Sequence, residues 1–229
     1  MVTDTTENKT HSIERLTSEE RRRQLIEVAL RLFSQKGFRG TTTRDIAHAA
    51  GINEAIIFRH FDSKEDLYAA ILTGKSVEAN VAQWREELRG YAERNDDERL
   101  FRSLAMKIIQ HHRDDPMFLR LMLFSALEGH PLAQRFGEQE ARPVQEFLCA
   151  YVIRRQREGA FRAGDPAAAV RAFVGAIIYH VLATELFGYE FQKISDQTAI
   201  KNFVSLFLEG IRQTQAEADI DCASHKKQK

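Results

Sequence analysis

The sequence has few of the residues that interrupt helices. Only 4 of its 229 residues are proline and 12 are glycine, the two types least compatible with a helix interior. Hydrophobic residues make up 43% and charged residues 29%, a balance typical of chains that bury a core. Long helices are therefore permitted along almost the whole chain, and we expect an all-α protein.

Cysteine is scarce as well. The two cysteines, Cys149 and Cys222, lie far apart and outside any CxxC pattern, which argues against a disulfide framework or a structural zinc site. We expect no metal and no cofactor. The N-terminus lacks the apolar stretch of a signal peptide. The longest uncharged run of the C-terminal half, residues 172–184, is shorter than the about 17 to 25 residues that cross a bilayer. These absences favour a cytoplasmic protein with no membrane partner.

The net charge of the chain is zero, since it has 33 basic and 33 acidic residues. The charges are unevenly distributed, because residues 21–64 hold nine basic and four acidic residues. A local basic excess attracts polyanions even when the whole chain is neutral. This excess coincides with the motif described next.

The N-terminal region contains three helix-start signals. Thr17 precedes Ser18, Glu19 and Glu20, a capping hydroxyl followed by acids in the first turn. The helix that follows has apolar residues at helical spacing and ends near Gly37; they are Leu25, Val28, Ala29, Leu32 and Phe33. Capping patterns recur at 42–45 and at 62–65. We therefore expect three helices between residues 18 and 72, with a short fourth one inserted.

Residues 42–61 predict two short helices hinged at Gly51. Thr42 and Asp45 form a capping box for the first helix. We expect the second helix over residues 53–61, with Ile52 and Phe58 pointing inward and its polar side chains exposed. Two short helices joined by a tight turn are the plan of the helix-turn-helix motif, whose second helix enters the DNA major groove.

The anchors of this segment resemble the DNA-binding domain of the TetR family of bacterial transcriptional regulators. The resemblance covers residues 21–72 and is carried by these motifs: Gly37-Phe38 followed by Thr41, Asp45-Ile46-Ala47, Ala50-Gly51-Ile52, Phe58-Arg59-His60-Phe61 and Lys64-Glu65-Asp66-Leu67. Beyond residue 75 the similarity is architectural. The resemblance implies a repressor that binds a palindromic operator as a homodimer and is released by a small effector.

The resemblance also assigns roles to individual residues. It implies phosphate contacts for Thr42, Thr43, Arg44, Phe58 and Lys64. It places five more on the exposed recognition surface, namely Asn53, Glu54, Ala55, Arg59 and His60. Position 58 is most often tyrosine in the family, so Phe58 lacks a hydroxyl that would bond a phosphate.

The chemistry of these side chains suits base contacts. Arg59 offers a two-pronged donor to guanine, Asn53 matches the adenine edge or a phosphate, and Ala55 suits a thymine methyl. Glu54 is the unusual member, because phosphates repel a carboxylate. The repulsion is offset only if Glu54 accepts from cytosine N4 or braces Arg59.

From residue 75 onward, the spacing of helix-breaking segments indicates a helical bundle. Breaks are expected at 95–97, 114–116, 129–131, 159–166 and 188–195. An interior rich in aromatic and sulfur side chains is either plain core or, as the resemblance implies, a pocket for an apolar or aromatic effector. The candidate pocket residues are Trp84, Phe101, Met106, His111, Phe118, Met122, Phe147, Tyr151, Phe173, Ile177 and His180.

The last two expected helices, at about 167–187 and 195–215, are apolar on more than one face. Two such helices from each subunit would form a four-helix dimer interface, where the family places its own. Burial within one subunit is the other interpretation.

We therefore predict a disordered arm at 1–17, a DNA-binding domain at 18–72, an effector and dimerisation domain at 73–215, and a disordered tail at 216–229. No catalytic residues are expected, because the sequence has no phosphate loop, HExxH or nucleophile elbow. The alternative function is a helical adaptor that binds protein instead of DNA. DNA binding that weakens steeply with salt would separate the two.

Overall fold

A computed structural model describes residues 16–75, 80–188 and 194–212, with side chains of 72–82 left aside. The described chain is helical, as predicted. Its first helices are α1 (Ser18–Lys36), α2 (Thr43–Ala50), α3 (Glu54–Ile57) and α4 (Lys64–Lys75). The later ones are α5 (Asn80–Glu93), α6 (Asp97–Asp114), α7 (Pro116–Leu127), α8 (Pro131–Phe136), α9 (Arg142–Arg157), α10 (Pro166–Val181) and α11 (Asp196–Ile211).

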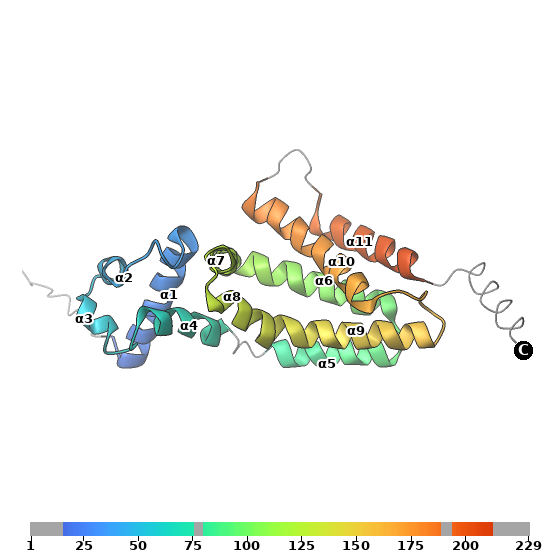
Figure 1. Ribbon diagram of the computed structural model, residues 1–229, viewed down its shortest axis with the longest axis horizontal. Coiled ribbons are helices and arrows are strands. Elements are labelled where there is room, and N and C mark those ends of the chain that lie inside the picture. The colour runs from blue at the N-terminus through green and yellow to red at the C-terminus, as the bar shows by residue number, and fades with distance from the viewer. Residues whose placement is uncertain (1–15, 76–79, 189–193, 213–229) are drawn as a thin grey trace, which may run out of the picture.

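The helices separate into two groups along the long axis of the molecule (Figure 1). Helices α1 to α4 form one end, and α5, α6, α9, α10 and α11 form the other. Helices α7 and α8 lie between the groups, and α7 packs against α1. Two π-helical turns, η1 (Gly137–Ala141) and η2 (Leu182–Leu186), connect α8 to α9 and extend α10.

Proline opens several helices of the bundle at breaks that the sequence predicts. Pro116 begins α7, and the Asp115 carboxylate accepts a hydrogen bond from Phe118 N at 3.0 Å. Pro166 begins α10, and the Asp165 side chain accepts from two amides of the first turn. Proline costs nothing at this position, because the first amides of a helix have no partner within it. The break at 188–195 lies partly outside the described residues.

The core at the N-terminal end includes side chains from the other group. Leu25, Phe33 and Ile46 are buried there together with Phe118 and Leu121 of α7. Leu132 of α8 joins the same cluster. Residues 18–72 are thus a continuous unit in sequence, but α7 and α8 complete their core. The predicted domain boundary at 72 remains a prediction about the chain.

The bundle has a separate core that contains a buried ion pair. The Arg155 guanidinium donates to both carboxylate oxygens of Asp97 at 3.0 Å, and the Tyr151 hydroxyl donates to the same carboxylate. Asp97 is only 8% exposed. The phenol has a raised pKa, first because it is buried and then because of its bond to Asp97. No pattern in the sequence indicates this pair, which joins the start of α6 to the end of α9.

The continuous helix Pro166–Leu186 is apolar and lies on the outside of the bundle. Its 21 residues are long and apolar enough to cross a membrane by length and composition alone. The uncharged run of residues 172–184 is shorter than this helix because Arg171 and Glu185 bound the run within it. Val170, Phe173 and Ile177 pack into the bundle core, while Tyr179 is exposed. An uncovered apolar face of this kind marks an interaction surface.

Candidate DNA-binding surface

Helix α2 begins with the predicted capping box. The Thr42 hydroxyl accepts from Asp45 N at 3.1 Å, and the Asp45 carboxylate accepts from Thr42 N at 2.9 Å. The hydrogen bonds from the Thr42 hydroxyl and backbone lower the pKa of Asp45. Other amides of the first turn have no partner within the helix, and they suit an anionic phosphate.

The hinge between α2 and α3 depends on Gly51. Its backbone is left-handed, with φ of 68° and ψ of 34°, a conformation that only glycine adopts without strain. Two residues later the Asn53 side-chain carbonyl accepts from Ala55 N at 2.9 Å and caps α3. This cap engages the carbonyl of Asn53 and leaves its amide N–H groups for a base or a phosphate.

Glu54 contacts Thr43 instead of Arg59. The Thr43 hydroxyl donates to the Glu54 carboxylate at 2.5 Å, which joins α2 to α3. The interpretation that Glu54 braces Arg59 is therefore not what the structure shows. A hydroxyl has one proton to donate, so a phosphate must displace Glu54 to receive it. The backbone amide of Thr43 remains suited to phosphate.

The inward residue of α3 is Ile57, not Phe58. Ile57 is fully buried, whereas Phe58 is 50% exposed and Ile52 is partly buried. The expected packing role of Phe58 is wrong, because α3 is a single turn that ends at Ile57 and not a helix through residue 61. An exposed aromatic ring beside α3 is free to lie against a DNA backbone, without the hydrogen bond of a tyrosine.

The remaining predicted DNA-contact residues lie on the same short elements. Arg44 follows the N-terminus of α2, and Ala55 and Arg59 are exposed on α3 and the turn after it. His60 is partly buried. The structure thus brings a helix N-terminus, an arginine fork and a small apolar side chain onto neighbouring exposed positions.

Lys64 is engaged within the protein. Its ammonium donates to the carbonyls of Phe38 at 2.9 Å and Thr41 at 3.0 Å, and lies 4.0 Å above the Phe38 ring. An ammonium has three N–H donors, so one remains for a phosphate. The predicted phosphate contact is untested, and Lys64 also has a second role in holding the loop before α2.

The eleven predicted effector contacts are divided between the two cores and the surface. Phe118 and Met122 belong to the N-terminal core, and Met106 is 53% exposed. His180 is buried, and its Nε2 lies 2.9 Å from the Asp196 carboxylate, which also binds Arg113. The bundle core contains the following: Trp84, Phe101, Phe147, Tyr151, Phe173 and Ile177. These six are packed together because aromatic rings fill the space between helices, as for Phe101 and Phe173 with centroids 5.1 Å apart.

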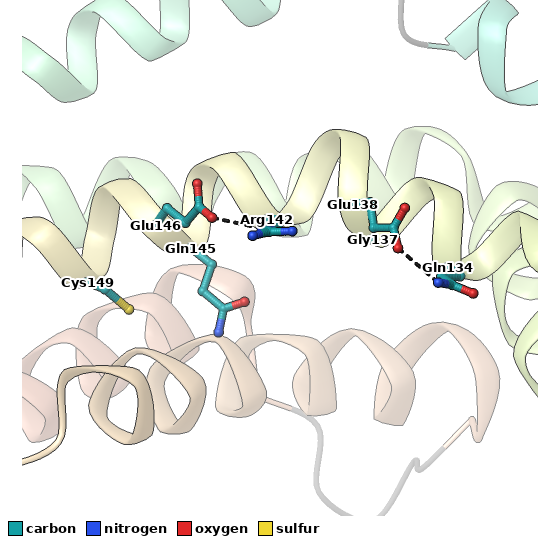
Figure 2. A pocket seen from close by; sticks show the side chains of 7 residues that line it. All are labelled: Gln134, Gly137, Glu138, Arg142, Gln145, Glu146 and Cys149. Carbon is teal, nitrogen blue, oxygen red and sulfur yellow. Dashed lines mark hydrogen bonds and ion pairs between the residues drawn. The ribbon is translucent and has the colours of Figure 1, made fainter.

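Two hollows lie elsewhere on the bundle, and none of the eleven residues lines either of them. The first has a volume of about 610 Å³ and is shown in Figure 2. Its walls include two hydrogen-bonded side-chain pairs, Arg142 with Glu146 and Gln134 with Glu138. The second, of about 380 Å³, is bounded by apolar side chains such as Val152, Phe161 and Phe207. Both hollows expose more apolar than polar surface, the kind of lining that the predicted effector requires.

The comparisons with known proteins agree on one family. Residues 25–71 match the model described as bacterial regulatory proteins, tetR family. The transcriptional repressor KstR2 of Rhodococcus jostii is 50% identical over 54 residues, which cover 24% of this chain and 26% of that relative. The uncharacterized regulator YvkB of Bacillus subtilis is 22% identical over 191 residues, 82% of this chain and 96% of YvkB.

A solved structure extends the similarity to the whole fold. AibR, in complex with isovaleryl coenzyme A and operator DNA, superposes with a TM-score of 0.59 at 19% identity. The match covers 82% of this chain and 97% of AibR. At this identity it establishes the fold alone.

The helix-turn-helix geometry and these matches define a DNA-binding regulator of transcription, with no enzymatic family among them. Residues 25–71 carry the DNA-binding domain of the TetR family of bacterial transcriptional regulators, and the rest of the chain is similar to solved members of that family in fold.

Proposed function

We propose that the protein is a homodimeric repressor that binds a palindromic operator in the bacterial cytoplasm and releases it when a small effector binds. The observation that carries the DNA-binding part is the joint exposure of the α2 N-terminus and of Asn53, Ala55 and Arg59 around α3. The N-terminus and the arginine suit phosphates and guanine edges respectively. The local basic excess supports the same surface.

The apolar outer surface of α10 and α11 supports dimerisation. Tyr179 and Phe187 are 56% and 48% exposed, and Leu206 on α11 is 67% exposed. Large apolar side chains at such exposure are stabilised when a second copy covers them. A twofold pairing of these two helices would give the four-helix arrangement expected from the sequence.

The bundle interior supports binding of an apolar or aromatic effector with a polar group. The buried Trp84 indole N–H and the His112 Nδ1 have no hydrogen-bond partner among the described residues. Buried polar atoms are almost always paired, so a ligand group that reached either atom would be stabilised there, although neither residue lines the two hollows described above. Since AibR is described with isovaleryl coenzyme A, acyl-coenzyme A thioesters are the first compounds to screen.

Release requires that the effector bind the DNA-incompetent arrangement more tightly than the competent one. A ligand with equal affinity for both would shift nothing. The contact between α1 and α7 gives such a ligand a physical route to the DNA-binding helices.

The first test is selection of duplexes from a random-sequence library with the full chain, followed by titration at several salt concentrations. We expect enrichment of two half-sites separated by one helical turn or a multiple of it. We expect affinity to fall steeply with salt and light scattering to give the mass of a dimer. A monomer would overturn the dimer, and failure to enrich any duplex would favour the protein-binding adaptor.

A further inference from the structure

The loop between α1 and α2 determines where the DNA-binding surface begins. It runs from Gly37 to Thr42, the residue that caps α2. Thr41 is buried, and its hydroxyl donates to the Gly37 carbonyl at 2.9 Å. Any displacement of this loop therefore moves the N-terminus of α2.

A carboxylate from the bundle side binds this loop. Glu128, at the C-terminal end of α7, accepts from Phe38 N at 2.9 Å and from Arg39 N at 3.3 Å. The Arg39 guanidinium donates in return to the Glu128 carbonyl at 3.2 Å. These partners are about 90 residues apart in the chain. Hydrogen bonds to an ionised acceptor are stronger than neutral ones.

Gly37 provides the space for this carboxylate. Its φ is 73°, and a Cβ at this position would overlap the Glu128 carboxylate. Both the backbone conformation and the close approach therefore require glycine.

The same loop is bound from its other side by Lys64 of α4, through the carbonyls of Phe38 and Thr41. Glu128 thus binds the amides of the loop and Lys64 binds its carbonyls. The Phe38 ring lies between them, 5.0 Å from the ring of Tyr68 and 4.5 Å from that of His130. Tyr68 belongs to α4 and His130 caps α8.

We propose that Glu128 is a positioning residue for DNA binding: it holds the 37–42 loop so that the N-terminus of α2 meets the DNA backbone. Because Glu128 ends α7, a shift of α7 relative to α1 would move the 37–42 loop and with it the N-terminus of α2. This inference rests on the proposed function. It differs from a base contact, because Glu128 acts through backbone amides and changes affinity for all sequences alike.

Glu128→Gln tests the proposal with little change in shape. The amide keeps one acceptor oxygen but presents N–H groups to a backbone amide that needs an acceptor. Against a duplex enriched by the wild-type chain, we expect binding about tenfold weaker. The ranking of duplexes with single base-pair changes and the salt slope should both be preserved.

Two further variants make the test specific. Gly37→Ala should weaken binding in the same way, since its Cβ displaces the carboxylate without removing the charge. Glu86→Gln is the matched control, an exposed glutamate of α5 paired with Arg89, and it should bind as the wild type does.

Hydrogen exchange of the proteins without DNA measures local opening of the loop, which a measurement of overall stability does not report. The amides of Phe38 and Arg39 should exchange faster in Glu128→Gln, while the rest of the core stays protected. Wild-type affinity for the duplex, or unchanged exchange at these amides, would overturn the assignment of Glu128 alone. Failure of the wild-type chain to enrich any duplex would instead overturn the proposed function, and this role with it.

Discussion

In the DNA-binding helices, the polar contacts that fix helix ends join residues a few positions apart, whereas the bundle is held by contacts between distant residues. Thr17 with Glu20 and Thr42 with Asp45 form capping boxes across three residues. Asp97 and Arg155, by contrast, are 58 residues apart. The comparison teaches that local pattern fixes the helix ends, whereas packing between distant segments fixes how the helices are arranged.

The largest effect is expected from breaking the distant contact. Asp97→Ala leaves the Arg155 guanidinium and the Tyr151 hydroxyl without their carboxylate. We expect the free energy of unfolding to fall by about 3 to 5 kcal/mol, because an unpaired buried charge remains. Denaturant titration measures this. The exposed pair of Arg89 and Glu86 is the control, since its loss should cost at most about 1 kcal/mol.

Acid should also destabilise the bundle, through His112 of α6. Burial, and then the neighbouring His111, lower the pKa of His112 from 6.5 to about 4, against a smaller opposing effect of Asp115. Above pH 6.5 both folded and unfolded chains carry the neutral ring. As the pH falls toward 4, the unfolded chain binds a proton that the folded chain does not, so stability is lost. The full shift corresponds to roughly 3 kcal/mol.

Unfolding titrations between pH 7 and pH 4.5 check this pH dependence. His112→Gln should remove that part of the loss, and an identical pH profile for the variant would show that another group is responsible.

Within the DNA-binding half, Arg59 and Lys64 should differ in the kind of effect they have. Arg59→Ala should cost about 1 to 3 kcal/mol and relax preference at one base pair. Lys64→Ala should weaken binding to all duplexes and lower the salt slope by about 0.9. Titrations against single-substituted duplexes at two salt concentrations separate the two, and indistinguishable variants would contradict both roles.

The smallest effect on stability is expected from removing either capping box, which allows the two boxes to be compared. Thr17→Ala and Thr42→Ala each remove a helix cap and should each lower stability by about 1 kcal/mol. Only Thr42→Ala should also weaken DNA binding, because Thr42 starts the helix whose N-terminus faces DNA in the proposed complex. Equal effects of the two variants on affinity would place the DNA elsewhere.

The sequence could predict the local features because their spacing is set by the helix itself. A capping box needs three residues, a buried stripe needs a period of 3.6, and a hinge needs a glycine. These patterns predicted α1, α2, the turn at Gly51 and the start of α4, and the proline and glycine breaks predicted the bundle. Such features carry the family motifs as well.

The length of α3 and the side of it that is buried could not be predicted in the same way. A single-turn helix has no periodic stripe to fix its face, so the inward position was expected at Phe58 and lies instead at Ile57. The bond from Thr43 to Glu54 depends on the angle between α2 and α3, which the spacing leaves undetermined.

The sequence by itself thus determined most of the helices, the caps at their ends and the resemblance of residues 21–72 to the TetR family. The tertiary structure decided which side chains meet across those helices: Glu128 with the 37–42 loop, Asp97 with Arg155, and Glu54 with Thr43. The physical reason is that helix geometry fixes distances only along a few residues of chain. Contacts between elements depend on how whole helices pack, and that depends on every side chain between them.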